Sequence, residues 1–372
     1  MAGGGLPRVL LIGDSLALGG TEGQFVEIAC GLKKAKWDVH VSCLRAEGPL
    51  RSTLEAAGLH ARSCGPGSFR SPRVLASVLE LVRYLRTQQI RLVHCFDFYS
   101  NLLGIPAARL ARVPVTIASQ RDLGDLRPPL QRRLHRAVLR LADLVLVNSP
   151  AVAERVRHDG ATLPERLVVI QNGVDLARFS PASRPRHRSD EVTIGTLANL
   201  RPEKGLTHLV RAAALVRDRH PRHRLVIWGE GPLRADLERL IRELGLSDTV
   251  ELRGTTTEPE AALRELDIFV LPSLSEACSN ALLQAMATGR AVVATRVGGN
   301  AALVADEMTG LLVPPADAGA LAAAIVKLIE HPALAAALAA RARRRVQSEF
   351  GVDRMLAHVQ SLYERGLAGA TA

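Results

Sequence analysis

Residues 268–290 read IFVLPSLSEACSNALLQAMATGR, and this stretch decides the fold. The apolar run Ile268–Pro272 has the length of a buried strand, and a helix is expected to begin near Asn280. A polar loop that contains Glu276 lies between them. A short strand without polar alternation, followed by a loop and a helix, is typical of a parallel sheet covered by helices on both faces.

The same unit recurs along the whole chain. Strands are expected at 8–13, 39–44, 92–95, 115–119, 144–148, 167–170, 193–197, 225–228, 250–252, 268–272, 291–295 and 311–313. Helices are expected between them, for example over 72–87, 129–141, 206–220 and 233–244. Because crossovers between parallel strands are right-handed, this alternation predicts an α/β protein with two doubly wound, Rossmann-like sheets.

The two series of strands are separated by a polar segment, SPASRPRHRSD at 180–190, which we interpret as an interdomain linker. The predicted domains are therefore an N-terminal domain at 1–182 and a C-terminal domain at 190–350. A last helix follows the break at Phe350-Gly351, and segment 351–372 is a candidate to pack back on the first domain. Ligands are expected in a cleft between the two domains, at the carboxyl ends of their strands.

The composition is that of a globular protein, with 47% hydrophobic and 23% charged residues among 372. Five scattered cysteines without a C-x-x-C pair argue against a disulfide framework or zinc site and favour a reducing compartment. There is no charged leader with an apolar core, and no run reaches the roughly 18 apolar residues of a membrane span. We therefore expect a cytoplasmic protein, with peripheral attachment to the inner membrane face left open.

Positive charge is concentrated in the first half of the chain. Residues 1–186 hold 26 Lys and Arg against 15 Asp and Glu, whereas residues 187–372 hold 22 of each. An anionic membrane or acceptor would explain this asymmetry, and so would an arginine-rich composition of every surface. Nucleic acid is disfavoured, because aromatics are 3% and no recognition motif is present. Arg132, Arg136 and Arg140 repeat at helical spacing, which suits either a membrane-facing or a solvated helix face.

The loop and helix after Ile268–Pro272 combine three groups that a nucleotide-sugar needs. Glu276 lies at the carboxyl end of the strand, and Gln284 shares a helix face with Asn280. The backbone amides of Asn280, Ala281 and Leu282 would be free at the helix start, where anions bind. The alternative is a surface loop with an incidental glutamate.

This segment resembles the donor-binding signature of family 4 glycosyltransferases, in which a second glutamate follows the first after seven residues. The flanking stretches that share the resemblance are Ala285–Gly289, Ala291–Thr295, Val297–Gly299 and Thr309–Val313. It implies the two-domain GT-B architecture and transfer from a nucleotide-sugar with retention of anomeric configuration. It also implies that Glu276 contacts the donor hexose and that position 284 contacts the ribose. The chain departs from the pattern there, because Gln284 lacks the charge of a glutamate. It departs again at 277–279, where Ala-Cys-Ser replaces a common Gly-Phe-Gly.

Segment NLRPEKG at 199–205 follows the first strand of the second half, where cations suit a diphosphate. By resemblance, Lys204 and Arg201 would stabilise the departing diphosphate; Asn199 stands where many relatives have arginine. Glycine pairs are candidates for close approach of the backbone to the donor. These donor-binding candidates are Gly19 and Gly20 in the first half, and Gly298, Gly299 and Asn300 in the second.

Arg121 and Asp122 end a strand of the first half and are candidate contacts to phosphate or acceptor, with an ordinary ion pair as the alternative. There is no D-x-D and no clustered His/Cys set, so we expect no metal and no cofactor. The charge of the leaving group would then fall to Lys204, Arg201 and helix amides.

The sequence therefore predicts a retaining glycosyltransferase of polysaccharide biosynthesis. Its donor would be a UDP- or GDP-linked hexose, and its acceptor a glycan, a lipid-linked glycan or a lipid. The main alternative is a catalytically degenerate protein that binds nucleotide-sugar or glycan as a partner or regulator, which Gln284 would favour. A GT-B nucleotide-sugar epimerase fits Lys204 and Glu276 poorly, and a dehydrogenase is disfavoured because the first strand lacks the G-x-G-x-x-G fingerprint.

Overall fold

The computed structural model describes residues 7–181 and 191–370 and divides the chain into two compact units. Unit 1 comprises residues 1–173 with 352–372, and unit 2 comprises residues 174–351. The division falls before the predicted limit of 182, because Val174 and Phe179 are buried in the core of unit 2. Most of the predicted linker, 182–190, lies outside the described residues.

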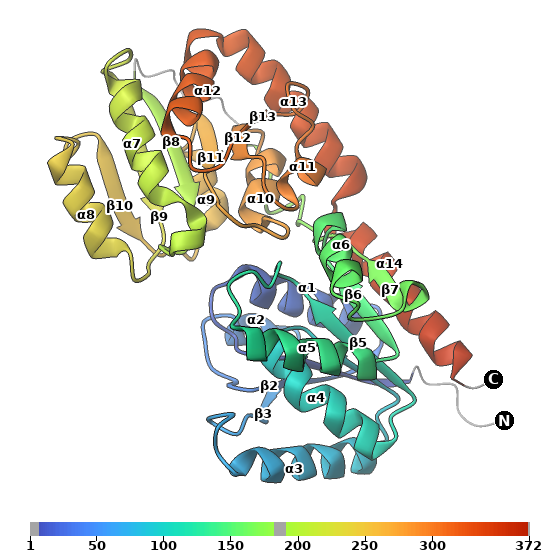
Figure 1. The fold of residues 1–372 in the computed structure, drawn as a ribbon. Coiled ribbons are helices and arrows are strands. Elements are labelled where there is room, and N and C mark those ends of the chain that lie inside the picture. Colours follow the sequence, from blue (N-terminus) through green and yellow to red (C-terminus); the bar gives the residue numbers. More distant parts are fainter. Residues whose placement is uncertain (1–6, 182–190, 371–372) are drawn as a thin grey trace. The chain divides into compact units, whose positions relative to one another are not determined.

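Unit 1 is built on a seven-stranded parallel sheet with helices on both faces (Figure 1). Its strands are β1 (Arg8–Gly13), β2 (Asp38–Cys43), β3 (Ala61–Ser63), β4 (Leu92–Cys95), β5 (Val115–Gln120), β6 (Leu144–Val147) and β7 (Leu167–Val169). Its helices are α1 (Gly20–Lys34), α2 (Arg51–Ala56), α3 (Arg73–Thr87), α4 (Phe98–Ala111), α5 (Pro129–Leu141), α6 (Pro150–His158) and α14 (Val352–Gly369). The strand order is β3-β2-β1-β4-β5-β6-β7.

Unit 2 is built on a six-stranded parallel sheet of the order β10-β9-β8-β11-β12-β13. Its strands are β8 (Val192–Leu197), β9 (His223–Trp228), β10 (Val250–Gly254), β11 (Ile268–Leu271), β12 (Ala291–Thr295) and β13 (Leu311–Val313). Its helices are α7 (Leu206–Arg217), α8 (Arg234–Glu243), α9 (Pro259–Arg264), α10 (Asn280–Ala287), α11 (Asn300–Leu303), α12 (Ala318–Glu330) and α13 (Pro332–Glu349). The two parallel sheets confirm the predicted α/β class.

The predicted strands all form, within one or two residues of their expected ends. The sequence did not predict β3, because Ala61-Arg62-Ser63 contains no apolar run. This strand lies at the edge of its sheet and pairs with β2 alone, so it needs no fully buried side chains.

Helix α14 is part of the core of unit 1, although it follows unit 2 in the chain. Met355, Val359, Leu362 and Tyr363 are buried together with α1 and the sheet. The hydroxyl of Tyr363 lies 2.6 Å from His94 Nδ1 on β4, and His94 Nε2 lies 2.7 Å from the Ser119 hydroxyl. Burial lowers the pKa of His94 well below its usual value, so the ring is neutral and this buried contact needs no counter-charge.

Each sheet has one point where the strand order reverses direction, between β1 and β4 in unit 1 and between β8 and β11 in unit 2. Helices leave for opposite faces there, so the strand ends are open to a ligand. The loops after these four strands are therefore the first places to search for a site.

Among the described residues, no single helix has both the length and the apolar character of a membrane span. One bent pair, α12 with α13, passes both criteria together, with an angle of 103° at the break.

Candidate active site

Strand β11 ends at the reversal point of unit 2, and its loop carries Glu276. One carboxylate oxygen, Oε2, accepts a hydrogen bond from the buried Ser273 hydroxyl at 3.1 Å. The Ser273 carbonyl in turn accepts the Thr295 hydroxyl at 2.6 Å. Only 11% of the Glu276 side chain is exposed. The loop thus holds the carboxylate in a fixed place at the edge of the sheet.

The neighbouring strand β8 places Lys204 against this carboxylate. Its ammonium nitrogen donates to Glu276 Oε2 at 2.7 Å, across 72 residues of sequence. A backbone hydrogen bond also joins the two loops, because the Leu274 amide donates to the Glu203 carbonyl at 2.7 Å. Lys204, which was predicted to bind the diphosphate, and Glu276, which was predicted to bind the hexose, are therefore in direct contact.

Gly205 makes this approach of the two loops feasible. Its φ is +62°, and an added Cβ would lie 2.1 Å from the Pro272 carbonyl oxygen. Sequence reasoning missed this role, although Gly205 ended the quoted motif. It also missed Gly229 and Gly231 in the β9–α8 loop, where added Cβ atoms would lie 1.9 Å and 2.5 Å from carbonyl oxygens of the β8 loop. The sequence Gly229-Glu-Gly-Pro was the signal that could have found them.

Asn199 and Arg201 lie in the same loop as Lys204 but are exposed. The Arg201 amide donates to the Asn199 carbonyl at 2.8 Å, which forms a tight turn before the Lys204 segment. Within the described part of the chain, the Arg201 guanidinium makes no hydrogen bond or ion pair with Lys204 or Glu276. The structure therefore brings Lys204, and not Arg201, to the carboxylate.

Helix α10 begins with a capped turn, and this corrects one prediction. The Ser279 hydroxyl accepts the Leu282 amide at 3.2 Å, so that amide is not free for an anion. A serine at the N-cap does this because its oxygen reaches the third amide of the helix. The amide of Ala281 remains a candidate. Gln284 is half-buried one turn further along the helix.

The glycine pair after β12 lies against the Glu276 loop. The Gly299 amide donates to the Glu276 carbonyl at 3.0 Å, and Gly298 adopts a left-handed φ of +46°. Asn300 differs from its predicted role as a donor contact. Its side chain is fully buried and donates to the Thr295 carbonyl at 3.0 Å, so it supports the loop from inside.

In unit 1, Gly19 caps helix α1 in an extended conformation and Gly20 begins the helix, directly after the reversal-point strand β1. Arg121 follows β5 and is 9% exposed. Its Nη2 donates to Asn172 Oδ1 at 2.7 Å, and its guanidinium lies 5.6 Å from the Phe96 ring centre. Arg121 is thus a buried, oriented cation at the carboxyl edge of the sheet.

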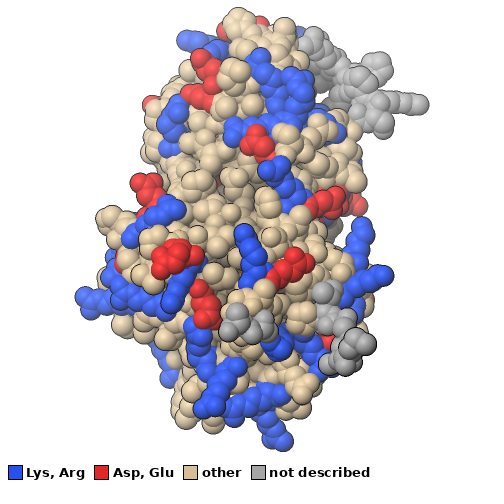
Figure 2. All heavy atoms as spheres, turned by 90° about the vertical axis from the view of Figure 1, so that its right-hand side faces the viewer, with Lys and Arg blue, Asp and Glu red and all other residues tan. Residues whose placement is uncertain are grey.

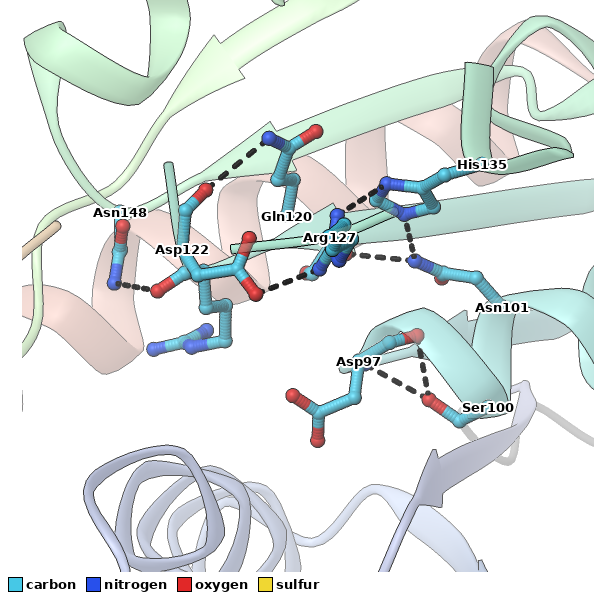
Figure 3. A network of polar contacts seen from close by, with 10 residues as sticks. Asp97, Ser100, Asn101, Gln120, Asp122, Arg127, His135 and Asn148 are labelled. Atoms are coloured by element: carbon cyan, nitrogen blue, oxygen red, sulfur yellow. Dashed lines mark hydrogen bonds and ion pairs between the residues drawn. The ribbon is translucent and has the colours of Figure 1, made fainter. Parts of the chain in front are cut away.

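Asp122 does not orient Arg121. Its carboxylate accepts Arg127 Nη2 at 2.7 Å, and Arg127 Nη1 also lies 2.8 Å from His135 Nδ1 (Figure 3). Burial, with the charge of Arg127, lowers the pKa of His135 to about 3, so the ring is neutral. The Asn101 amide nitrogen lies 3.1 Å from the other ring nitrogen. Asp122 thus forms the ordinary ion pair that was the alternative prediction, and its partner is Arg127.

Two carboxyl groups at the reversal point of unit 1 escaped the sequence analysis. Asp14 follows β1 and Asp97 follows β4; Asp14 Oδ1 accepts the Ser100 amide at 2.9 Å. Burial raises the pKa of Asp14 to about 6. Burial, and then the charge of Asp14, raises the pKa of Asp97 well above its usual value. Figure 3 shows the Asp97 carboxyl group directed away from the Arg127 contacts. A polar residue directly after each apolar run was the available signal.

Comparison with known proteins assigns these two units. The family model "Glycosyltransferase Family 4" matches residues 18–178, and "Glycosyl transferases group 1" matches residues 191–331. D-inositol 3-phosphate glycosyltransferase of Pseudarthrobacter chlorophenolicus is 35% identical over 289 residues, which are 70% of this chain and 69% of that protein. The chain is a family 4 glycosyltransferase. The resemblance carried by residues 268–290 is thereby confirmed.

The chain is also similar to another curated protein and to solved structures. MMP alpha-(1->4)-mannosyltransferase of Mycolicibacterium hassiacum is 31% identical over 286 residues, 73% of this chain and 68% of that protein. Among solved structures, HepE of Anabaena in complex with UDP-glucose has a TM-score of 0.86 at 21% identity, covering 96% of this chain and 99% of that one. Sucrose-phosphate synthase of Thermosynechococcus elongatus has a TM-score of 0.82 at 23% identity, covering 98% and 100%. At these identities the likeness establishes the GT-B fold of this family 4 member.

Proposed function

We propose that the protein transfers a hexose from a UDP- or GDP-linked donor to a hydroxyl group of a glycan, a lipid-linked glycan or a lipid, with retention of anomeric configuration. The observation that carries the proposal is the contact of Lys204 with Glu276 at the reversal point of unit 2. In a nucleotide-sugar, the hydroxyl groups of the transferred sugar lie at one end of the diphosphate. Glu276 offers a hydrogen-bond acceptor for these hydroxyl groups, and Lys204 offers a cation for the diphosphate.

Glu276 positions the sugar in this proposal. Ser273 and Lys204 both bind its Oε2, so Oε1 is left to accept hydrogen bonds from donor hydroxyl groups. A carboxylate accepts such bonds about twice as strongly as a neutral group does. Gln284 would contact the ribose through its amide, with less strength than a glutamate.

Lys204 supplies positive charge to the departing diphosphate, together with the amide of Ala281 and with the exposed Arg201. A cation beside the diphosphate stabilises charge that develops in the transition state, and we therefore propose that transfer needs no metal ion. The bond from the anomeric carbon to the diphosphate oxygen breaks as the acceptor oxygen attacks from the same face. The acceptor proton passes to the departing diphosphate oxygen, so no side chain of the protein has to take it.

Unit 1 would hold the acceptor. Arg121 is a buried cation, and Asp14 and Asp97 are carboxyl groups that hydrogen-bond sugar hydroxyls whether ionised or protonated. The relative from Pseudarthrobacter is named for an inositol phosphate, which supports an acceptor that carries negative charge. We propose that the enzyme works in the cytoplasm, where its cysteines stay reduced, and close to an anionic membrane surface.

Thermal unfolding in EDTA with UDP-glucose, GDP-mannose, ADP-glucose and the free nucleotides tests the donor site, because a ligand that binds only the folded state raises the melting temperature. We expect one nucleotide class to stabilise the protein and Lys204→Ala to abolish the effect. Lys327→Ala is a matched control, since it removes a Lys–Glu pair of 2.9 Å on the exposed surface of unit 2. A stabilisation that survives Lys204→Ala would refute the assignment.

Sugar transfer to a panel of acceptors then separates an enzyme from a degenerate binder, and NMR of the anomeric proton in the product reports retention. The intact Lys204–Glu276 contact supports an active enzyme over the degenerate alternative. Binding of the donor without transfer to any water-soluble or lipid acceptor would favour that alternative instead.

A further inference from the structure

Helix α5 of unit 1 has an unusual outer surface. Its thirteen residues, PLQRRLHRAVLRL, include four arginines and no acidic residue. Leu130 is 67% exposed, Leu134 is 45% exposed and Leu141 is 47% exposed. The spacing of four and seven residues aligns these leucines along one side of the helix. Leu126, in the loop before the helix, is 71% exposed. We call these four leucines the α5 apolar stripe.

Three arginines on the outer surface of α5 lack internal partners, and Arg133 is the one that lies beside the stripe. Arg132, Arg133 and Arg136 are exposed, and within the described residues their guanidinium groups form no hydrogen bond or ion pair. Arg132 and Arg136 border a hollow whose other charged lining residues are Arg127, Arg155 and Asp159. Arg127 and Arg155 are neutralised by Asp122 and Asp159, at 2.7 Å and 3.1 Å. The net positive charge of the hollow therefore comes from Arg132 and Arg136.

Unit 1 also exposes apolar side chains on another helix. Helices α3, α4 and α5 lie next to one another on one face of the unit 1 sheet (Figure 1), and Leu75 and Leu79 of α3 are 65% and 56% exposed. Of the fourteen large apolar residues that are exposed in the described chain, eleven belong to unit 1. Figure 2 shows another side of the molecule, where Lys and Arg again gather over its lower end. Exposed apolar area and positive charge thus coincide in the same unit.

A leucine stripe beside unpaired arginines needs a partner that is apolar and anionic together. A second copy packed face to face would bring the arginines of two α5 helices together without any acid on the helix, so self-association is disfavoured. A bilayer with anionic lipids offers acyl chains to the leucines and phosphates to the arginines, which suits a helix that lies in the interface plane.

We propose that α5 is the membrane-docking element of this protein. The α5 apolar stripe enters the upper acyl region of an anionic bilayer, and Arg133 and Arg136 lie beside the phosphates of the lipid head groups. This inference rests on the proposed function, because docking would bring unit 1 to an acceptor at the membrane.

Sedimentation of the full chain with vesicles tests the proposal in the absence of donor and acceptor. We expect binding to vesicles of phosphatidylcholine with phosphatidylglycerol, and little binding to phosphatidylcholine alone. Leu130→Gln with Leu134→Gln should weaken the partition constant by about tenfold or more, because two exposed leucines leave the apolar contact. Arg133→Gln with Arg136→Gln should weaken it by about 30-fold, and added salt should do the same to the unaltered protein.

Arg211→Gln with Leu215→Gln is the matched control. Both residues are exposed on α7 of unit 2, four positions apart, and this variant should bind vesicles like the unaltered protein. Melting temperatures establish that each variant is folded, and nucleotide-sugar binding in unit 2 should persist in all of them. Failure of docking is thereby distinguished from failure of the donor site.

Three results would overturn the proposal. The first is no sedimentation of the folded protein with anionic vesicles. The second is vesicle binding that the leucine and arginine variants leave unchanged. The third is a dimer in light scattering that becomes a monomer in Leu130→Gln with Leu134→Gln, which would assign the stripe to self-association.

Discussion

Replacement of Glu276 by glutamine should separate the two parts of the donor site. The side chains of Lys204 and Glu276 are 24% and 11% exposed, with their charged atoms 2.7 Å apart. Opposite charges at about 4 Å attract by about 4 kcal/mol at an effective dielectric constant of 20, and desolvation leaves a net coupling of about 1–2 kcal/mol. Because Lys204 must turn from Glu276 toward a bound diphosphate, this coupling opposes nucleotide binding.

Glu276→Gln removes that opposition and also removes the charged acceptor for sugar hydroxyls. We expect free UDP, or GDP if that is the preferred base, to bind about 5- to 30-fold more tightly, which is 1–2 kcal/mol at about 1.4 kcal/mol per factor of ten. Sugar transfer should fall by about 100-fold or more, because the lost interaction orients the reacting sugar. Binding of the free nucleotide and of the nucleotide-sugar is measured by titration calorimetry, and transfer by product formation.

Glu203→Gln is the control for a simple change of net charge. Glu203 is next to Lys204 in the chain, and only its carbonyl oxygen contacts the Glu276 loop, so its side chain can be neutralised without breaking the ion pair. This variant should bind free nucleotide nearly as the unaltered protein does. If Glu276→Gln instead weakened free nucleotide as strongly as Lys204→Ala, the division between a sugar-binding carboxylate and a diphosphate-binding lysine would be wrong.

Three further changes test other parts of the site. The pKa of Asp14 rises from 3.8 to about 6 on folding, so the folded state binds more protons and stability should fall as the pH rises from about 4 to 6. Asp14→Asn should reduce this dependence, leaving the part due to Asp97, and should stabilise the protein at pH 7 by about 1–2 kcal/mol, measured by denaturant unfolding across that range. Gly205→Ala places a Cβ 2.1 Å from the Pro272 carbonyl in a left-handed conformation, so it should cost about 2 kcal/mol or more and weaken nucleotide binding; wild-type melting and affinity would contradict the geometry. Gln284→Glu should strengthen binding of the ribonucleotide by about tenfold and leave the 2′,3′-dideoxy analogue unaffected, whereas equal effects on both would separate position 284 from the ribose.

Much of the donor site could be predicted because its residues are close in sequence and follow strands. Glu276, the helix start at Asn280 and Gln284 belong to one strand–loop–helix unit, whose local pattern fixes which groups reach the carboxyl end of the sheet. The missed features depend on contacts that composition does not reveal. The Leu282 amide is occupied because Ser279 adopts the N-cap position, and Asn300 turns inward because the Thr295 carbonyl is its nearest acceptor.

In unit 1 the sequence identified the cation at Arg121 and missed the carboxyl groups beside the reversal point. Asp14 and Asp97 follow strands that are 78 residues or more apart in sequence, and they interact because β1 and β4 pair in parallel. Nothing in either segment indicates which strand lies beside it. The same holds for Tyr363 and His94, which meet only when α14 returns to the core of unit 1.

The sequence by itself determined the element types, the two parallel sheets and the family, because these depend on short apolar runs and on motifs of adjacent residues. Tertiary structure decided which side chains act as pairs. Lys204 and Glu276 are 72 residues apart, and they meet because β8 and β11 are neighbours at the point where the strand order reverses. Strand order is set by the packing of whole helices on both faces of the sheet, so the Lys204–Glu276 pairing of the proposed donor site is a property of the folded unit and not of any segment.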